Sequence, residues 1–227
     1  MQQAPTRREA SQIILATVIG STVLPFLKGC GSNVGGSSGG GRIEIIDNPE
    51  DVLGNSRVQE GIRVIENAGY YMNLSRSLNP PYLVGEYNLS GEKFYPQDYT
   101  ISPGTFRWRN QTQDNHIETD YTQIGIQSGR NIYGEIIRGE GNLFTVYSRL
   151  KISQGGCGGI SDFIIDGEQL GNGDINAVYL STIIGVDAGC TASEDLVAGA
   201  IELSPIGYPK RISPEINNLY PFLNSFR

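Results

Sequence analysis

A period of two in the apolar residues, repeated between residues 82 and about 203, constrains the fold of this chain more than any other feature. Phe106 and Trp108, for example, alternate with Thr105, Arg107 and Arg109. Successive side chains of a β-strand point to opposite faces, so this alternation predicts strands with one buried face. The clearest runs are 105–109, 123–127, 144–152 and 177–184.

Turn-forming residues separate these runs. Gly, Asn, Asp and Ser favour tight turns because they tolerate left-handed backbone or bond to it locally. Short connections between several strands predict an antiparallel meander, which closes as an up-and-down barrel or folds as a sandwich. We expect a mainly β domain of about eight strands and prefer the barrel, since hairpin-length connections dominate. The expected turns are Ser90–Gly91, Ser128–Asn131, Gly139–Asn142, Gly155–Gly159 and Asp166–Asp174.

A helical appendage is expected at 43–79, before the β domain at 80–204. Apolar residues spaced by three and four predict one short amphipathic helix over Ser56–Leu74, with Ser56 as its cap and Gly69 near its end. A short strand is expected at 42–46, and two consecutive prolines after Asn79 mark the boundary.

The first 29 residues have the order of an export leader. Arg7 and Arg8 precede a mostly apolar stretch from Ile13 to Leu27. A signal peptide has this basic-then-apolar arrangement. The stretch is shorter than the roughly 20 apolar residues of a permanent membrane span.

The residues Leu27-Lys28-Gly29-Cys30 resemble the lipobox of bacterial lipoproteins, although Lys28 departs from its usual small or neutral residue. The resemblance implies removal of 1–29, acylation of Cys30 with palmitate or a similar chain, and anchoring in the cell envelope. Gly31 after the cysteine favours the outer membrane over the inner one. The Gly/Ser-rich segment 30–42 is then a flexible tether. The alternatives are simple secretion, an uncleaved anchor, a twin-arginine signal around Arg7 and Arg8, and a cytosolic protein without an export leader.

The opening of the β domain, Tyr82–Gly91, and the order of helix before barrel resemble lipocalin-like (calycin) barrels. The Gly-x-Trp motif of lipocalins is absent. The resemblance therefore implies an architecture, and no function follows from it.

Charge and cysteines narrow the class of protein. The net charge is −7, and it becomes −9 if 1–29 is removed, because that segment holds three basic residues and one acidic residue. Such an acidic domain argues against nucleic-acid binding and against a polybasic membrane patch.

Apart from Cys30, only Cys157 and Cys190 remain. An even number of cysteines in an exported chain predicts one disulfide.

One segment carries candidate chemistry. Asp114, His116, Glu118 and Asp120 share parity, so an extended backbone would direct all four to one face. An imidazole with three carboxylates can hold a divalent cation or act in acid–base catalysis. Neighbours on one strand face lie about 6–7 Å apart, which favours the alternative of a solvated hairpin loop.

Three other features have structural and functional interpretations. Asp166–Asp174 offers oxygen ligands for calcium but lacks the EF-hand spacing, so a plain turn is favoured. Gly155–Gly159 lacks the Lys-Ser/Thr of a phosphate loop and fits a turn that carries a disulfide. Many tyrosines can line a ligand pocket or pack the sheet. They are Tyr82, Tyr87, Tyr95, Tyr99, Tyr121, Tyr133, Tyr147 and Tyr179.

The C-terminal tail at 205–227 holds many apolar residues, so we expect it to pack back along the domain or to close one mouth of the barrel. The sequence thus predicts a lipid-anchored extracytoplasmic β domain with a binding or structural role, and no catalytic motif or cofactor is inferred. Its partners are the membrane through Cys30 and a small apolar ligand, a glycan or an envelope protein. The alternatives are a metal-dependent hydrolase that uses Asp114–Asp120, and an interaction subunit of an envelope assembly. A filled barrel interior would favour the interaction role, and an open one would favour a ligand.

Overall fold

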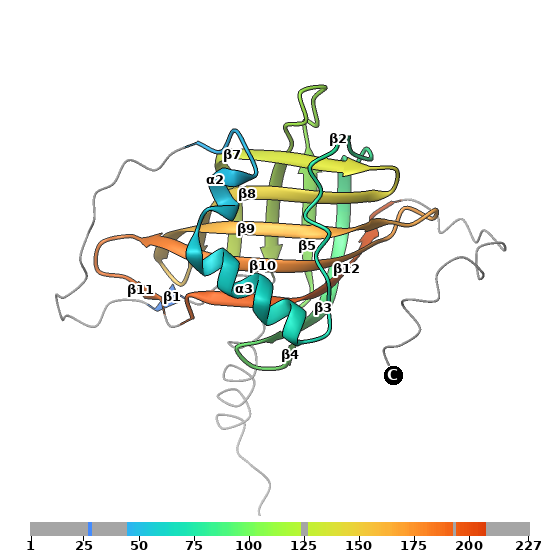
Figure 1. Ribbon diagram of the computed structural model, residues 1–227. Helices are drawn as coiled ribbons and strands as arrows, with labels where there is room; N and C mark the ends of the chain where they lie inside the picture. Colours follow the sequence, from blue (N-terminus) through green and yellow to red (C-terminus); the bar gives the residue numbers. More distant parts are fainter. Residues whose placement is uncertain (1–26, 29–44, 124–126, 193, 208–227) are drawn as a thin grey trace, which may run out of the picture.

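The computed structural model describes residues 27–28, 45–123, 127–192 and 194–207. Eight antiparallel strands follow one another around a closed barrel, as predicted, and Figure 1 shows the helices lying outside it. The last strand pairs with the first, which closes the barrel. The eight strands are β3 (Gly85–Tyr95), β5 (Gly104–Arg109), β6 (Glu118–Gln123), β7 (Gln127–Glu140), β8 (Leu143–Gln154), β9 (Cys157–Gln169), β10 (Ile175–Val186) and β12 (Leu196–Pro205).

Four two-residue strands lie outside this ring. They are β1 (Leu27–Lys28), β2 (Leu78–Asn79), β4 (Tyr99–Thr100) and β11 (Thr191–Ala192). β1 pairs with β11, β2 runs parallel to β7, and β4 pairs with β3. Residues 45 and 46 are not in a strand, so the strand expected at 42–46 is absent from its described part. The whole tether at 30–42, including Cys30, and residues 208–227 lie outside the described residues.

Large apolar side chains of all eight strands meet inside the barrel. The rings of Phe106 and Trp108 lie 4.9 Å apart between centroids, and Trp108 and Phe144 lie 5.8 Å apart. Each of these side chains is at most 1% exposed. The main core is therefore the barrel interior. Its largest side chains are Trp108, Tyr121, Tyr179, Phe106, Phe144 and Phe163.

A second apolar layer lies between the barrel and two helices, α2 (Glu50–Leu53) and α3 (Ser56–Asn67). Figure 1 shows α3 crossing the outer face of β10 and β12. Gly61 of α3 approaches β10 so closely that a Cβ there would lie 2.9 Å from Leu180 Cδ2. Both faces of β10 are therefore buried over much of its length, although alternation alone predicts one buried face.

The helix is shorter than predicted, since it ends at Asn67 instead of Leu74. Gly69 follows with a φ of +86°, a left-handed conformation typical of a residue after a helix. Asn55 caps the helix in place of the expected Ser56, because its side chain accepts the Arg57 N–H at 2.9 Å. The Asn55 amide also donates to Asp162 on β9 at 3.1 Å, which fixes the start of the helix on the barrel.

Several expected turns lie within strands. Ser90–Gly91 belongs to β3, Ser128–Asn131 to β7 and Asp166–Gly167 to β9. At Gly167 the reason is steric, because a Cβ there would lie 2.6 Å from the Ala177 Cβ of the neighbouring strand. Gly91 and Gly167 permit close packing of the sheet and do not mark turns. Residues 124–126, which supplied the alternation at 123–127, lie outside the described part.

Candidate functional site

The predicted metal ligands do not converge on one point. Asp114 lies in a turn, His116 is exposed beside β7, and both later carboxylates face an arginine. Arg109 Nη2 lies 2.5 Å from an oxygen of Asp120 and 3.7 Å from one of Glu118. Within the described residues, no group of three or more His, Cys, Asp or Glu side chains is arranged to hold a metal ion.

Asp120 instead belongs to a row of charges across the outer face of the barrel. Glu86 pairs in register with Arg107, Arg107 with Asp120, Asp120 with Arg130, and Arg130 with Lys151. The Glu86 and Arg107 side chains lie 2.9 Å apart. Opposite charges on adjacent strands attract modestly when exposed. The row alternates in sign from Glu86 to Arg130 and ends on a second cation, Lys151, and it emerges only from the register of five strands.

The acidic residues of the expected calcium loop have separate partners. Asp166 is buried on the outer face of β9 and accepts the Asn73 N–H at 2.6 Å and the Leu74 N–H at 3.0 Å. Burial disfavours the charged form of the Asp166 carboxyl group more than these hydrogen bonds favour it, so the pKa of Asp166 is raised. Glu168 accepts from Asn142 at 2.7 Å. The carboxyl group of Asp166 therefore fixes the segment after α3 to the barrel.

The predicted disulfide between Cys157 and Cys190 is present, with the two Cα atoms 5.7 Å apart. Gly155 and Gly156, both with positive φ, form the turn before β9. This agrees with the interpretation of Gly155–Gly159 as a turn that carries a disulfide. The bond fixes the loop before β11 to the start of β9.

The tyrosines divide between the core and the surface. Burial raises the pKa of Tyr121 and of Tyr179, which lie inside the barrel, well above the ordinary value. Tyr87 is also in the interior, while Tyr147 packs in the outer layer. Tyr82 is exposed. Most of the described tyrosines therefore pack the sheet, and the side chain of Tyr133 lies outside the described part.

A buried carboxyl group inside the barrel was missed by the sequence interpretation. Glu135 is 1% exposed, and its carboxyl group accepts the Thr119 N–H at 2.6 Å and the Ser148 hydroxyl at 2.7 Å. The Thr119 hydroxyl also donates to it. Glu135 follows an irregularity in the pairing of β7 with β8. A bulge of this kind can redirect a side chain inward, and no local sequence pattern indicates it.

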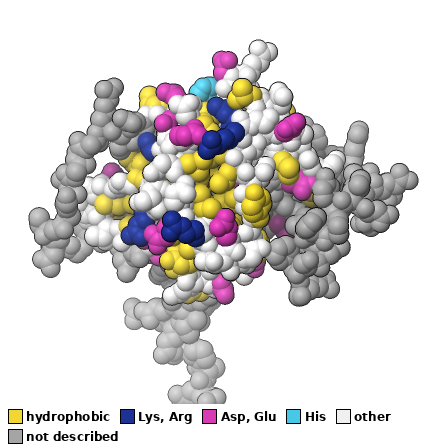
Figure 2. Space-filling view, in the orientation of Figure 1, with side chains coloured by type: hydrophobic (Ala, Val, Ile, Leu, Met, Phe, Trp, Pro, Cys, Tyr) yellow, Lys and Arg dark blue, Asp and Glu magenta, His cyan; other side chains and the backbone are white. Residues whose placement is uncertain are grey.

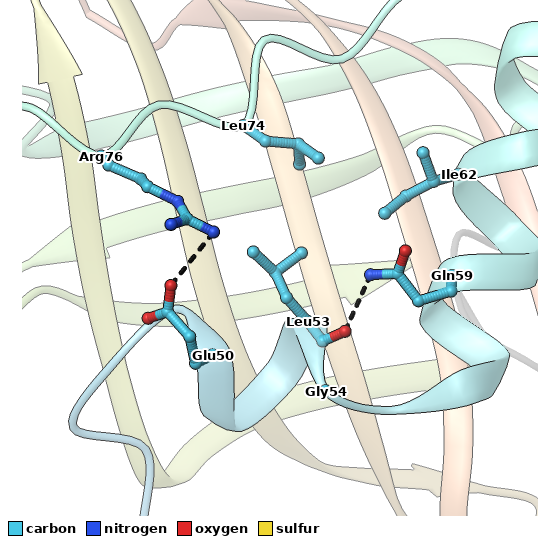
Figure 3. Close-up of a pocket in the computed structure, with 7 residues that line it drawn as sticks. All are labelled: Glu50, Leu53, Gly54, Gln59, Ile62, Leu74 and Arg76. Carbon is cyan, nitrogen blue, oxygen red and sulfur yellow. Dashed lines mark hydrogen bonds and ion pairs between the residues drawn. The ribbon is translucent and has the colours of Figure 1, made fainter.

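A shallow groove lies on the helical side of the molecule, outside the barrel (Figure 3). It has a volume of about 420 Å³ and an apolar floor of Leu53, Ile62 and Leu74. Glu50 and Arg76 form an ion pair of 3.1 Å at one end, and Gln59 donates to the Leu53 carbonyl at 2.8 Å. In Figure 2 hydrophobic side chains gather near the middle of this face, between acidic and basic ones.

Comparison with known proteins does not identify a relative. No protein-family model matches the chain, and neither do any curated proteins or solved structures at a significant level. Among the described residues, no helix has both the length and the apolar character needed to span a bilayer.

Proposed function

We propose that this chain is a lipid-anchored protein of the cell envelope, with the outer membrane favoured, whose barrel contacts another envelope protein through its outer surface. The acylated Cys30 is the membrane attachment, and no catalytic step is assigned. The observation that carries the proposal is that the described inward-facing side chains fill the barrel interior.

The described inward-facing side chains occupy the space that a ligand would need. An eight-stranded barrel is just wide enough for side chains to fill it or for one small ligand. Here Phe163 and Tyr179 lie 6.2 Å apart, and Phe106 and Tyr121 lie 6.1 Å apart between ring centroids. Leu83 is fully buried in the same cluster, next to the start of β3. Contacts with other molecules are therefore expected on the outside.

The groove of Figure 3 is the surface feature that best fits such a contact. Its aliphatic floor can receive an apolar side chain, and its polar ends can orient a peptide backbone. A partner protein supplies both kinds of group.

Removal of the leader is compatible with this fold. Cleavage before Cys30 would remove Leu27–Lys28, which form β1. β1 pairs with β11 and belongs to a separate two-stranded sheet, so all eight barrel strands would remain.

Metabolic labelling with palmitate tests the anchor. We expect label in the wild-type chain and none in Cys30→Ser. Equal labelling of both chains would refute the proposed attachment site.

Site-specific photo-crosslinking in intact cells tests the surface role. A crosslinker at residue 62, in the groove, is expected to give one discrete product, and one at exposed residue 90 is expected to give none. Equal products from both positions, or none from residue 62, would contradict a role for the groove.

A further inference from the structure

Exposed apolar side chains gather at one end of the barrel, which we call the apolar rim. At this end lie the β7–β8 and β9–β10 connections and the end of β12, which Figure 1 shows on the same side. The rim consists of Leu78, Tyr82, Val84, Leu143 and Ile206, which are 64%, 68%, 36%, 42% and 42% exposed.

Hydrogen bonds and register connect the rim residues to one another. Leu78 pairs with Gly139 beside the hairpin that contains Leu143. The Tyr82 carbonyl accepts from the Gln169 side chain at 3.3 Å, and Gln169 N–H donates to the Asn142 carbonyl at 2.8 Å.

The other side of the rim is fixed by β3. Ile206 N–H donates to the Glu86 carbonyl at 2.7 Å, which places Ile206 near Val84 at the start of that strand. Single exposed apolar residues are ordinary, but several around one end form a patch that is typical of an interaction surface.

The chain itself provides a segment for this patch. Residues 208–227 lie outside the described part and begin two positions after the rim residue Ile206. Twenty residues extend to at most roughly 70 Å, whereas a strand of the length of β9 spans about 43 Å. When extended, the segment is therefore longer than this barrel strand, which puts the rim residues within its reach. Its apolar residues include Ile212, Ile216, Leu219, Tyr220, Phe222 and Phe226.

The charge of residues 208–227 also favours this segment as the one that covers the apolar rim. The segment carries Lys210, Arg211 and Arg227 against Glu215, a net charge of +2. The remaining 207 residues therefore carry a net charge of −9, which with the +2 of the segment gives the total of −7. Glu140, which is exposed, pairs in register with the rim residue Leu143. Lys210 and Arg211, three and four positions after Gly207, would lie within reach of the Glu140 carboxylate.

We propose that residues 208–227 dock on the apolar rim. The apolar residues of the segment bury the exposed rim side chains, while Lys210 and Arg211 remain near Glu140. This inference is independent of the proposed function, because it requires neither the lipid anchor nor a partner.

Limited trypsin digestion of the full chain with Cys30→Ser tests the proposal. Trypsin cuts after Lys210 and Arg211, and mass spectrometry follows loss of the segment. The rim variant is Tyr82→Ser with Leu143→Ser. The matched control, Ile184→Ser with Val186→Ser, removes two exposed apolar side chains from the opposite end of β10. Trp108 emission checks that each variant is folded.

We expect cleavage in the rim variant to be faster by about tenfold or more, because docking would lose the burial of two side chains. Leu219→Ser with Phe222→Ser should accelerate it similarly, and the control should match the unmodified chain. Equal cleavage rates in all variants would overturn the proposal. A rim-dependent dimer in light scattering, with unchanged cleavage, would also overturn it and assign the rim to a second copy of the chain.

Discussion

Tyr179 on β10 and Gly199 on β12 are register partners, and a Cβ atom at residue 199 would clash with the backbone carbonyl oxygen of Glu92 on β3 and lie 2.7 Å from the Tyr179 hydroxyl oxygen. The glycine therefore makes room for a large ring inside the barrel. We expect Gly199→Ala to lower the free energy of unfolding by about 1–3 kcal/mol, as overpacking does in well-packed cores. Urea unfolding measures this change.

Gly185 provides the control for that substitution. It also lies on β10, but a Cβ atom there would meet nothing within 4 Å. Gly185→Ala should therefore change the free energy of unfolding by less than about 0.5 kcal/mol. Equal effects of the two substitutions would contradict tight packing around Gly199.

The hydroxyl of Ser148 should stabilise the barrel through the carboxyl group of Glu135. Ser148→Ala removes one donor from this buried acceptor, and we expect a loss of about 1–3 kcal/mol. Ser153→Ala on the same strand changes an exposed residue and serves as the control. If both alanine variants unfold at the same urea concentration, the buried network contributes nothing measurable.

The disulfide should be a major source of stability. Cys157 and Cys190 are 33 positions apart, and opening a loop of this length costs roughly 3–4 kcal/mol in the chain-entropy model. Replacing both residues by serine should lower the urea midpoint accordingly, whereas Cys30→Ser should not. Immediate alkylation of both cysteines in the unreduced protein would show that the bond is not formed.

The raised pKa of Asp166 predicts that the free energy of unfolding depends on pH. Burial raises the pKa of Asp166 in the folded chain, so between its ordinary and raised pKa the folded state binds the proton more tightly than the unfolded state. Its contribution to stability is therefore present at acidic pH and declines as pH rises through the folded pKa.

Comparison with Asp166→Asn isolates this contribution, because all other titrating groups are shared. The stability of the wild type relative to the variant should decrease as pH is raised from about 4 towards neutrality. Urea unfolding at several pH values measures the difference. A difference that stays constant or grows with pH would contradict the predicted direction.

Much of the fold could be predicted because strands have a local signature. The alternation in 105–109, 144–152 and 177–184 identified β5, β8 and β10, and cysteine pairing followed from counting. The turn predicted at glycines such as Gly167 was wrong, because such a glycine lies within a strand and allows close contact with the neighbouring strand. Sequence spacing does not reveal which strand that neighbour is.

The surroundings of individual polar residues could not be predicted for the same reason. Asp120 faces arginines supplied by β5 and β7, and Glu135 is satisfied by residues of β6 and β8. Each environment depends on register between strands that are distant in sequence. Parity within one strand placed Asp114, His116, Glu118 and Asp120 together, but it carried no information about these partners.

Quenching of Trp108 fluorescence by acrylamide tests the filled interior most directly. Trp108 is the single tryptophan of the chain, and it is fully buried among Tyr87, Phe106 and Phe144. We predict emission at short wavelength and quenching far slower than in the urea-unfolded chain. Quenching as efficient as in the unfolded chain would show an open interior and contradict a barrel that acts through its outer surface.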